Sequence, residues 1–448
     1  MEHMDTSILN LGECRHRSPL GLSTVAGDMT GDFTPESARV RYQVEFGGLA
    51  DLPDVAFEKA GPRENIFFDP KHTRAAIVTC GGICPGINNV IRSAFLEMHY
   101  NYGVPEVLGL RYGYAGLNPA TAQSPIRLTR DVVDHIHEHG GTMLGTSRGP
   151  QPPDVMAKYL ADNKINILIC VGGDGTLRGA NDIANEARRL NLPIAVVGVP
   201  KTIDNDVMFV ERTFGVSTAM ERASQVLDCA HTEARSVFNG VGLVKVMGRE
   251  AGFIACLSTL ANQEVNLTLI PEVPFTLDGE KGAMEFLRKR LKSRKHAVVV
   301  VAEGAGQELL NAYPGGTDKS GNRRLSDIGV FLKERMIEHF AALGIPIEVK
   351  YFDPSYIIRS GPANADDAVF CDQLSRNAVH AAMAGKSGAV ISYWNGTFMH
   401  VPIALAASRK KQVDPEGSLW SGVLAATGQP RQFTNVEPGA HRPAALRV

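Results

Sequence analysis

Apolar runs of strand length alternate with amphipathic stretches of helix length along most of the chain. From residue 74 onward, short runs rich in Val, Ile and Ala are followed by a loop and then by a segment with helical periodicity. Runs that are apolar throughout are typical of parallel strands covered on both faces. The pattern predicts an α/β fold with mostly parallel sheets between helix layers. We expect strands at 75–80, 106–111, 165–171, 194–199, 242–247, 297–302, 348–352 and 388–393, and helices at 178–190, 216–234, 252–262, 280–293, 328–342 and 365–384.

The remaining segments lack this alternation. Residues 1–72 are rich in Gly, Pro and charged residues, with one strand-like piece at 40–45. Residues 307–327 are predicted to form an exposed loop, and the last 25 or so residues, rich in Pro, Gly and Arg, are predicted to be mobile. A chain of 448 residues should form two or three domains. We expect an N-terminal extension (1–72), two three-layer α/β domains (73–214, completed by 358–408, and 215–357) and a C-terminal segment (409–448).

Composition narrows the class of protein. Hydrophobic residues make up 44% of the chain and charged residues 21%, which is typical of a folded protein. A net charge of −2 argues against nucleic acid as the main partner. We find no apolar run of transmembrane length and no signal peptide, so we expect a cytoplasmic protein with no membrane partner. Seven cysteines without paired spacing indicate reduced thiols.

The segment 165–180, INILICVGGDGTLRGA, is the most informative part of the chain. Gly172 and Gly173 follow a strand and allow the backbone to approach a ligand closely. We expect Thr176 to open a helix, whose free N–H groups suit a phosphate, while Asp174 offers a carboxylate to Mg²⁺. A simple strand-ending turn explains such a GGDG about half the time. A similar double glycine at 81–82 also follows a strand, so two loops at one sheet edge could hold one polyphosphate.

The segment 200–206, PKTIDND, follows the next expected strand. Asp and Asn are ordinary turn residues, so turn chemistry is the alternative explanation. Phosphoryl transfer, however, requires a proton acceptor, which Asp204 or Asp206 can be, and groups that bind phosphate, which Lys201 and Thr202 supply. We favour the functional interpretation of this segment.

Other candidates carry weaker signals. Arg249 in MGRE follows a strand and could stabilise a developing phosphoryl charge, although surface arginines are common. Arg148 ends a small-residue loop, for which a flexible connection is as good an explanation. His135, His137 and His139 lack a further ligand at metal spacing, so we expect a solvated helix end there.

Taken in order, these motifs resemble the 6-phosphofructokinase family. The resemblance spans about residues 74–408 and rests on GGICPGINNVIR (81–92), GYAGL (113–117), GGTMLGTSRGP (140–150), GGDGT (172–176), PKTIDND (200–206), MGRE (247–250), IPE (270–272) and DPSYIIR (353–359). GGDGT alone also occurs in NAD and lipid kinases, but PKTIDND with MGR is much more specific. The chain is most similar to the long branch that contains plant and trypanosomatid ATP-dependent enzymes.

The resemblance implies phosphoryl transfer from ATP to the 1-hydroxyl of fructose 6-phosphate. It implies that Asp204 is the general base, assisted by Lys201 and Arg249, and that Asp174 holds Mg²⁺. It also implies a two-domain phosphofructokinase fold with the active site in the cleft between the domains. The implied nucleotide-binding residues are Gly82, Tyr112, Arg148, Gly173, Asp174, Gly175, Thr176 and Gly179. The implied sugar-phosphate-binding residues are Thr202, Ile203, Asp204, Asp206, Met247, Gly248, Arg249, Glu272, Lys350, Tyr356 and Arg359.

Two residues give opposing signals about the phosphoryl donor. In this family, Gly at position 175 leaves room for the α-phosphate of a nucleotide, whereas diphosphate-dependent members usually carry Asp there. Lys201, in contrast, is usual in diphosphate-dependent members. The long ATP-dependent branch combines this Gly with this Lys, so we favour ATP and keep diphosphate as the alternative. Less favoured alternatives are an NAD or lipid kinase and a non-catalytic regulatory subunit, but the latter should lack Asp174 or Asp204.

The chain also departs from compact bacterial members. Those have Asp where Ile83 stands, His where Tyr356 stands, and Arg where Lys350 stands. They donate an arginine across a subunit boundary from the position of Gly240, so here either another basic residue, with Arg235 as the candidate, replaces it or the 6-phosphate is held differently. The family resemblance further implies a homotetramer, or else a homodimer, in which residues 1–72 wrap a neighbouring subunit or form a partly ordered tail.

Overall fold

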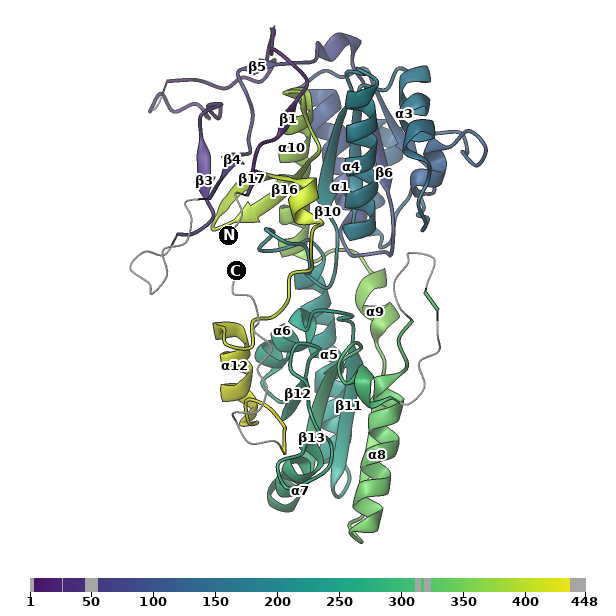
Figure 1. Ribbon diagram of the computed structural model, residues 1–448, viewed down its shortest axis with the longest axis vertical. Coiled ribbons are helices and arrows are strands. Elements are labelled where there is room, and N and C mark those ends of the chain that lie inside the picture. Colours follow the sequence, from purple (N-terminus) through teal and green to yellow (C-terminus); the bar gives the residue numbers. More distant parts are fainter. Residues whose placement is uncertain (1–3, 26, 45–54, 311–315, 318–323, 436–448) are drawn as a thin grey trace. The chain divides into compact units, whose positions relative to one another are not determined.

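The computed structural model describes residues 4–25, 27–44, 55–310, 316–317 and 324–435. The chain forms two compact units (Figure 1). The first consists mainly of Met1–Ala219 and Arg359–Lys411, and the second of Met220–Gly316, Arg323–Ile358 and Gln412–Val448. No helix among the described residues is long and apolar enough to cross a membrane.

The first unit is built on a sheet whose five central strands are parallel. In spatial order these are β16 (Ala389–Trp394), β10 (Ala195–Pro200), β9 (Ile167–Gly172), β6 (Arg74–Thr79) and β7 (Glu106–Leu110). Every residue of β9 and β10 is buried, as their uninterrupted apolar sequences predict.

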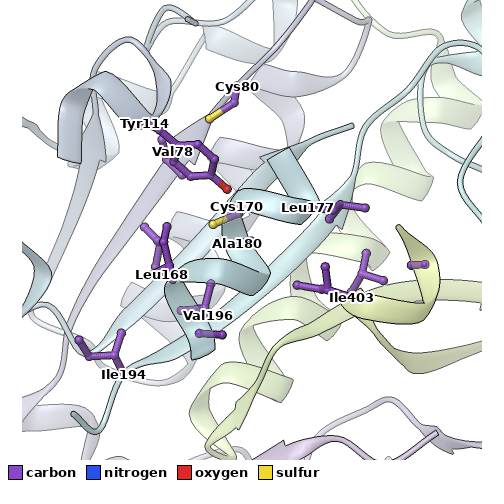
Figure 2. Packing of buried hydrophobic residues seen from close by; sticks show 14 of the residues in the cluster. Val78, Cys80, Tyr114, Leu168, Cys170, Leu177, Ala180, Ile194, Val196 and Ile403 are labelled. Atoms are coloured by element: carbon purple, nitrogen blue, oxygen red, sulfur yellow. The ribbon is translucent and has the colours of Figure 1, made fainter. Parts of the chain in front are cut away.

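Helices cover both faces of this sheet and complete three layers. α1 (Ile87–Leu96) packs against α10 (Ala365–Met383) on one face, and α3 (Pro153–Asp162) against α4 (Asp174–Arg189) on the other (Figure 1). Figure 2 shows Leu177 and Ala180 of α4 packed over side chains of β9 and β10. The sequence prediction of a three-layer α/β architecture is therefore confirmed.

Antiparallel strands extend the sheet at both edges. β17 (Thr397–Pro402) returns along β16 after a tight turn in which Asn395 and Gly396 both have positive φ. β4 (Ala56–Lys59) pairs with β17, and β3 (Arg39–Arg41) pairs with β4. The described part of the N-terminal extension thus adds strands to its own sheet. At the far edge, β8 (Ile126–Arg127) pairs with β7, and two short ladders join β1 (Leu9–Asn10) to β15 (Lys386–Ser387) and β2 (His16–Arg17) to β5 (Asn65–Ile66).

The second unit has a four-stranded parallel sheet in the order β12 (Leu267–Leu269), β13 (His296–Ala302), β11 (Gly240–Val246) and β14 (Glu348–Phe352). Two glycines of β11 let α5 (Val216–Arg235) approach closely, because a β-carbon on Gly240 would lie 2.2 Å from the Ala234 carbonyl oxygen. The same contact leaves no space for an arginine at position 240. The other helices of this unit are α6 (Phe253–Asn262), α7 (Ala283–Arg294), α8 (Ile328–Ala342) and α12 (Ser418–Thr427), which packs on α6.

Two local expectations were wrong, and a third holds only in part. The helix that we expected to begin after Thr176 begins at Asp174, because Gly173 alone connects it to β9. The last 25 or so residues are not mobile between 424 and 435, where Gln429 binds both the N–H and the carbonyl of Thr268 and Phe433 is buried; residues 436–448 lie outside the described part. In the expected exposed loop at 307–327, Gln307 is buried in a short 3₁₀ helix, but none of the other described residues of the segment is buried; residues 311–315 and 318–323 are outside the described part.

Several short elements complete the described chain. They are α2 (Arg130–Val133), α9 (Ser355–Ser360), α11 (Ile403–Ala406) and the turns of helix at Pro70–His72, Glu97–Asn101, Gly113–Leu117 and Ile136–Glu138.

Candidate active site

The carboxyl edge of the first sheet contains a topological switch point. β6 and β9 are neighbours, but the chain continues from β6 to β7 on one side and from β9 to β10 on the other. Consequently α1, after β6, and α4, after β9, cover opposite faces of the sheet. The loops that precede them diverge at this point, which is where open α/β sheets commonly bind ligands.

The loop after β6 brings two arginines together. A β-carbon placed on Gly82 would lie 3.6 Å from Arg148 Nη2 and 3.9 Å from Arg359 Nη1. Thr146 anchors the Arg148 loop, since its hydroxyl donates to the Gly81 carbonyl at 2.7 Å. The absence of a side chain at Gly82 therefore exposes backbone beside two guanidinium groups, an arrangement suited to an anion.

Lys201 links the loop after β10 to the loop after β6. Its Nζ donates to the Gly82 carbonyl at 2.6 Å, and the residue is only 6% exposed. Burial lowers the pKa of this ammonium group. A buried cation beside Gly82 adds to the positive potential of the two arginines.

The first turn of α4 carries the candidate metal ligand. Asp174 forms an ion pair with Arg178 one turn later, at 2.7 Å, and its side chain is 17% exposed. A β-carbon on Gly175 would have no atom within 4 Å, so position 175 faces open space. Thr176, in contrast, is buried, and its backbone carbonyl accepts a hydrogen bond from the Tyr114 hydroxyl at 2.5 Å. The N-terminus of α4 is thus fixed by packing while its position 175 stays open.

The PKTIDND segment forms a braced loop after β10. The Thr202 hydroxyl donates to Asp206 Oδ1 at 2.7 Å and accepts from the backbone N–H of Asp204 at 3.2 Å. Asn205 adopts a left-handed conformation, with φ of 55°, and its side-chain oxygen accepts from the Thr213 N–H at 3.0 Å. Ile203 is buried and anchors the loop, while Asp204 is partly exposed. These hydrogen bonds therefore hold the backbone of Asp204 in place at the strand end.

Sequence reasoning missed Lys410, which lies beside this loop. Its Nζ donates to Asp206 Oδ2 at 2.6 Å and lies 3.7 Å from Asp174 Oδ2. No local sequence pattern indicates that Lys410 contacts this loop, because the lysine follows Asp206 by more than two hundred positions.

Two predicted nucleotide residues have clear packing roles. A β-carbon on Gly179 would lie 2.5 Å from the Tyr114 ring, so glycine is required there by the neighbouring side chain. Tyr112 has a φ of 57° and its ring packs over Gly145, where a β-carbon would lie 2.6 Å away. Its side chain remains 39% exposed and thus accessible to a ligand.

In the second unit, the MGRE motif follows β11 and the IPE motif follows β12, two strands that β13 separates in the sheet. Met247, Gly248 and Arg249 come directly after β11, where Gly248 has a φ of 126°. Glu272 Oε1 accepts hydrogen bonds from the Gly252 N–H at 2.9 Å and the Val413 N–H at 2.8 Å.

The second carboxylate oxygen of Glu272 is buried and has no hydrogen-bond partner among the described residues. Burial raises the pKa of this carboxyl group, although the two backbone N–H groups act in the opposite direction. A buried acceptor without a hydrogen-bond partner destabilises the fold unless a ligand donates to it. Glu272 is therefore a strong candidate to accept a hydrogen bond from a hydroxyl group of a ligand.

The structure does not bring Lys350 to the ends of these strands. Lys350 lies within β14 opposite Gly242, and it forms an ion pair with Glu348 at 2.6 Å. Met247 follows Gly242 by five positions, which at about 3.3 Å per residue separates them by ~16 Å along the strand. Tyr356 lies in α9 and is 75% exposed.

Within the described residues, no group of three or more His, Cys, Asp or Glu side chains could hold a metal ion. His135 precedes a short 3₁₀ helix and pairs with Glu138, which raises the pKa of the imidazole. All seven cysteines are free thiols.

Comparison with known proteins identifies the family. The model of the phosphofructokinase family matches residues 74–382. A protein of Borreliella burgdorferi named ATP-dependent 6-phosphofructokinase is 46% identical over 97% of this chain and 99% of its own length. One of the same name from Amycolatopsis methanolica is 44% identical over 96% of each chain. The crystal structure of a pyrophosphate-dependent phosphofructokinase from Marinobacter aquaeolei, 20% identical, has the same fold, with a TM-score of 0.65 over 83% of this chain and 95% of that one. This chain therefore belongs to the phosphofructokinase family.

Proposed function

We propose that this chain is an ATP-dependent 6-phosphofructokinase. It transfers the γ-phosphoryl group of ATP to the 1-hydroxyl of fructose 6-phosphate and forms fructose 1,6-bisphosphate and ADP. The observation that carries this proposal is the open position at Gly175 in the first turn of α4, beside Asp174. The names of relatives that are 44–46% identical over nearly the whole chain support the same activity.

Asp204 is the proposed general base. It lies after β10 in a loop whose backbone is braced by Thr202 and Asn205, and its carboxylate accepts the proton of the attacking hydroxyl. Lys201 and Arg249 are the proposed catalytic cations. Positively charged groups stabilise the phosphoryl group as negative charge spreads over its oxygens in the transition state.

The first unit is the proposed nucleotide domain. The N-terminus of α4, the Gly82 backbone and the guanidinium groups of Arg148 and Arg359 supply donors for a polyphosphate. In this proposal Arg359, which the sequence assigned to the sugar phosphate, contributes on the side of the phosphates because it lies beside Arg148.

Mg²⁺ fits this donor set. Mg²⁺ commonly binds one or two carboxylates together with substrate phosphates and waters, and Asp174 is such a carboxylate at an accessible helix terminus. The metal would neutralise phosphate charge when bound. Asp174 would hold it, together with the phosphates of the nucleotide and waters.

Gly175 favours ATP over diphosphate as the donor. A side chain at this position would point into open space rather than into protein, so the gap is available to a ligand. Diphosphate remains the alternative donor because Lys201 is present, but here its ammonium group is engaged by the Gly82 carbonyl.

The second unit is the proposed sugar-phosphate domain, with Glu272 accepting a sugar hydroxyl and Met247, Gly248 and Arg249 lining the site. Lys350 and Tyr356 remain proposed contacts of the 6-phosphate. Since Lys350 lies far from Met247 within its own sheet, we propose that it serves the site of a neighbouring subunit in a homotetramer, or else a homodimer. We also propose that the enzyme acts in the cytoplasm on these small molecules.

The activity is tested by incubating the protein with fructose 6-phosphate and MgATP and following ³¹P NMR. New sugar-phosphate resonances and ADP must appear together in equal amounts. ADP formation without a new sugar phosphate would refute the proposed acceptor. If this protein gave no reaction under conditions in which related enzymes are active, the proposed activity would be refuted.

A further inference from the structure

Lys410 joins the two carboxylates assigned above to different ligands. Its ammonium group donates to Asp206 Oδ2 at 2.6 Å and lies 3.7 Å from Asp174 Oδ2. Asp206 follows β10 and Asp174 follows β9, so one lysine connects the ends of two neighbouring parallel strands. Its side chain is 28% exposed, and the Asp174 and Asp206 side chains are 17% and 11% exposed.

The backbone fixes where this lysine can reach. Lys410 forms an isolated antiparallel bridge with Val207, and the N–H of Lys411 donates to the Asp206 carbonyl at 2.9 Å. The ammonium group of Lys411 in turn donates to the Val210 carbonyl at 2.6 Å. Residues 410 and 411 are therefore held in register with the PKTIDND loop, and the position of the Lys410 ammonium is not a chance surface contact.

The charges around this lysine explain why a cation is needed there. Asp174, Asp204 and Asp206 crowd one end of the sheet, and a polyphosphate donor adds further negative charge. Arg178, which pairs with Asp174 Oδ2, has a side chain that is 57% exposed and is therefore strongly screened by solvent. Lys410 is less exposed and lies against both Asp174 and Asp206, so its charge acts on both.

We propose that Lys410 is a positioning residue of the active site, which orients Asp206 toward the sugar phosphate and weakens the hold of Asp174 on the divalent cation. The first effect follows from the hydrogen bond to Asp206, and the second from a cation close to a metal ligand. This inference rests on the proposed function, but its metal part can be measured without turnover.

The test compares Lys410→Met with Lys410→Arg and with the control Arg409→Met. Arg409 is the exposed neighbour, so its substitution removes the same charge from the same segment. Binding of Mn²⁺ to each protein without nucleotide is measured by electron paramagnetic resonance, and the KM for fructose 6-phosphate and kcat are measured separately. Circular dichroism and thermal unfolding confirm that each variant is folded.

Opposite changes in metal binding and catalysis are expected for Lys410→Met. Its Mn²⁺ dissociation constant should fall about fivefold, the effect of removing one charge about 4 Å away in a water-like dielectric. Its KM for fructose 6-phosphate should rise about tenfold, while Lys410→Arg stays near wild type in both and Arg409→Met is unchanged. A merely structural brace would weaken metal binding or leave it unaltered.

Equal or weaker Mn²⁺ binding by Lys410→Met, or no binding by any of the proteins, would overturn the inference. A wild-type protein that binds Mn²⁺ as expected but has no activity with fructose 6-phosphate and ATP would instead refute the proposed function. The two failures are therefore distinguishable.

Discussion

Replacing Gly175 with aspartate would place a carboxylate where the proposed donor binds. A β-carbon at this position meets no atom within 4 Å, so the folded protein can accept the side chain without rearrangement. Position 175 also lies in the first turn of α4, where a negative charge interacts favourably with the helix dipole by about 0.3–1 kcal/mol. Aspartate is better than glycine within a helix by only about 0.1–0.3 kcal/mol, and repulsion from Asp174 offsets part of these gains. The variant should thus be at least as stable as the wild type.

The same carboxylate should strongly disfavour ATP. Two like charges about 4 Å apart repel by about 1 kcal/mol in water and by about 4 kcal/mol at the effective dielectric near a protein surface. These energies correspond to a loss in kcat/KM for ATP of roughly fivefold to a thousandfold. Increased or unchanged stability combined with a large loss of activity separates a donor-site effect from a folding defect.

The assay couples fructose 1,6-bisphosphate formation to NADH oxidation, with ATP varied at saturating fructose 6-phosphate. Gly175→Ala and Gly175→Asn are the matched controls, because they add a β-carbon or a neutral side chain of the same size. Gly175→Asp should lose much more activity than Gly175→Asn, and Gly175→Ala least of all. If Gly175→Asp kept its kcat/KM for ATP within about threefold of wild type, the assignment of this position to the donor would be refuted.

Three further predictions concern the base, the packing of α4 and the sheet edge. Asp204→Asn should lower kcat by about 10²–10⁴ without changing circular dichroism, and near-normal turnover in stopped-flow assays would refute its role as the base. Gly179→Ala should destabilise the protein by about 1–3 kcal/mol in urea unfolding because its β-carbon would lie 2.5 Å from the Tyr114 ring, and unchanged stability would contradict this packing. Burial opposes ionisation of Glu58, but His400, Lys386 and Arg63 outweigh it and lower its pKa to about 2. Because the pKa is lowered in the folded state, ionised Glu58 stabilises the fold above the unfolded-state pKa near 4.5, and this stabilisation is lost as the pH falls toward 2. Over that range the free energy of unfolding of the wild type should fall by about 2–3 kcal/mol more than that of Glu58→Gln. Parallel pH profiles of the unfolding free energy would refute this prediction.

The features that sequence predicted well depend on residues close together in the chain. β9 and β10 are buried along their full length, so their apolar runs identified them without knowledge of their neighbours. The loops after them were recognised because their glycines and carboxylates directly follow those runs. Helix boundaries were predicted less accurately than strands. We expected Thr176 to open the helix, but Gly173 alone connects β9 to α4, which begins at Asp174.

The features that sequence missed depend on pairings across long separations. β4 joins the sheet by pairing with β17, where Met399 lies opposite Lys59, and no local sequence pattern connects residues so far apart. The turn that creates β17 did carry a usable signal, because an Asn–Gly pair between apolar runs favours a hairpin. Lys410 carried none, since its importance comes only from the spatial neighbourhood of Asp206.

Similar reasoning applies to the candidate site. Motif resemblance assigned Lys350 to the same set as Met247, but β-sheet register places Lys350 opposite Gly242, well before the strand end. Gly179 was assigned to the nucleotide, whereas its close approach to the Tyr114 ring gives a packing reason for glycine. A motif thus identifies the residues, and the register and packing indicate which of them can act together.

The most direct test of the proposed function compares phosphoryl donors in one assay. Purified protein with saturating fructose 6-phosphate and Mg²⁺ is given either ATP or diphosphate, and fructose 1,6-bisphosphate is measured through aldolase-coupled NADH oxidation. We predict turnover with ATP and no turnover above background with diphosphate. Turnover with diphosphate that equals or exceeds turnover with ATP would contradict the assignment of the open position at Gly175 to a nucleotide.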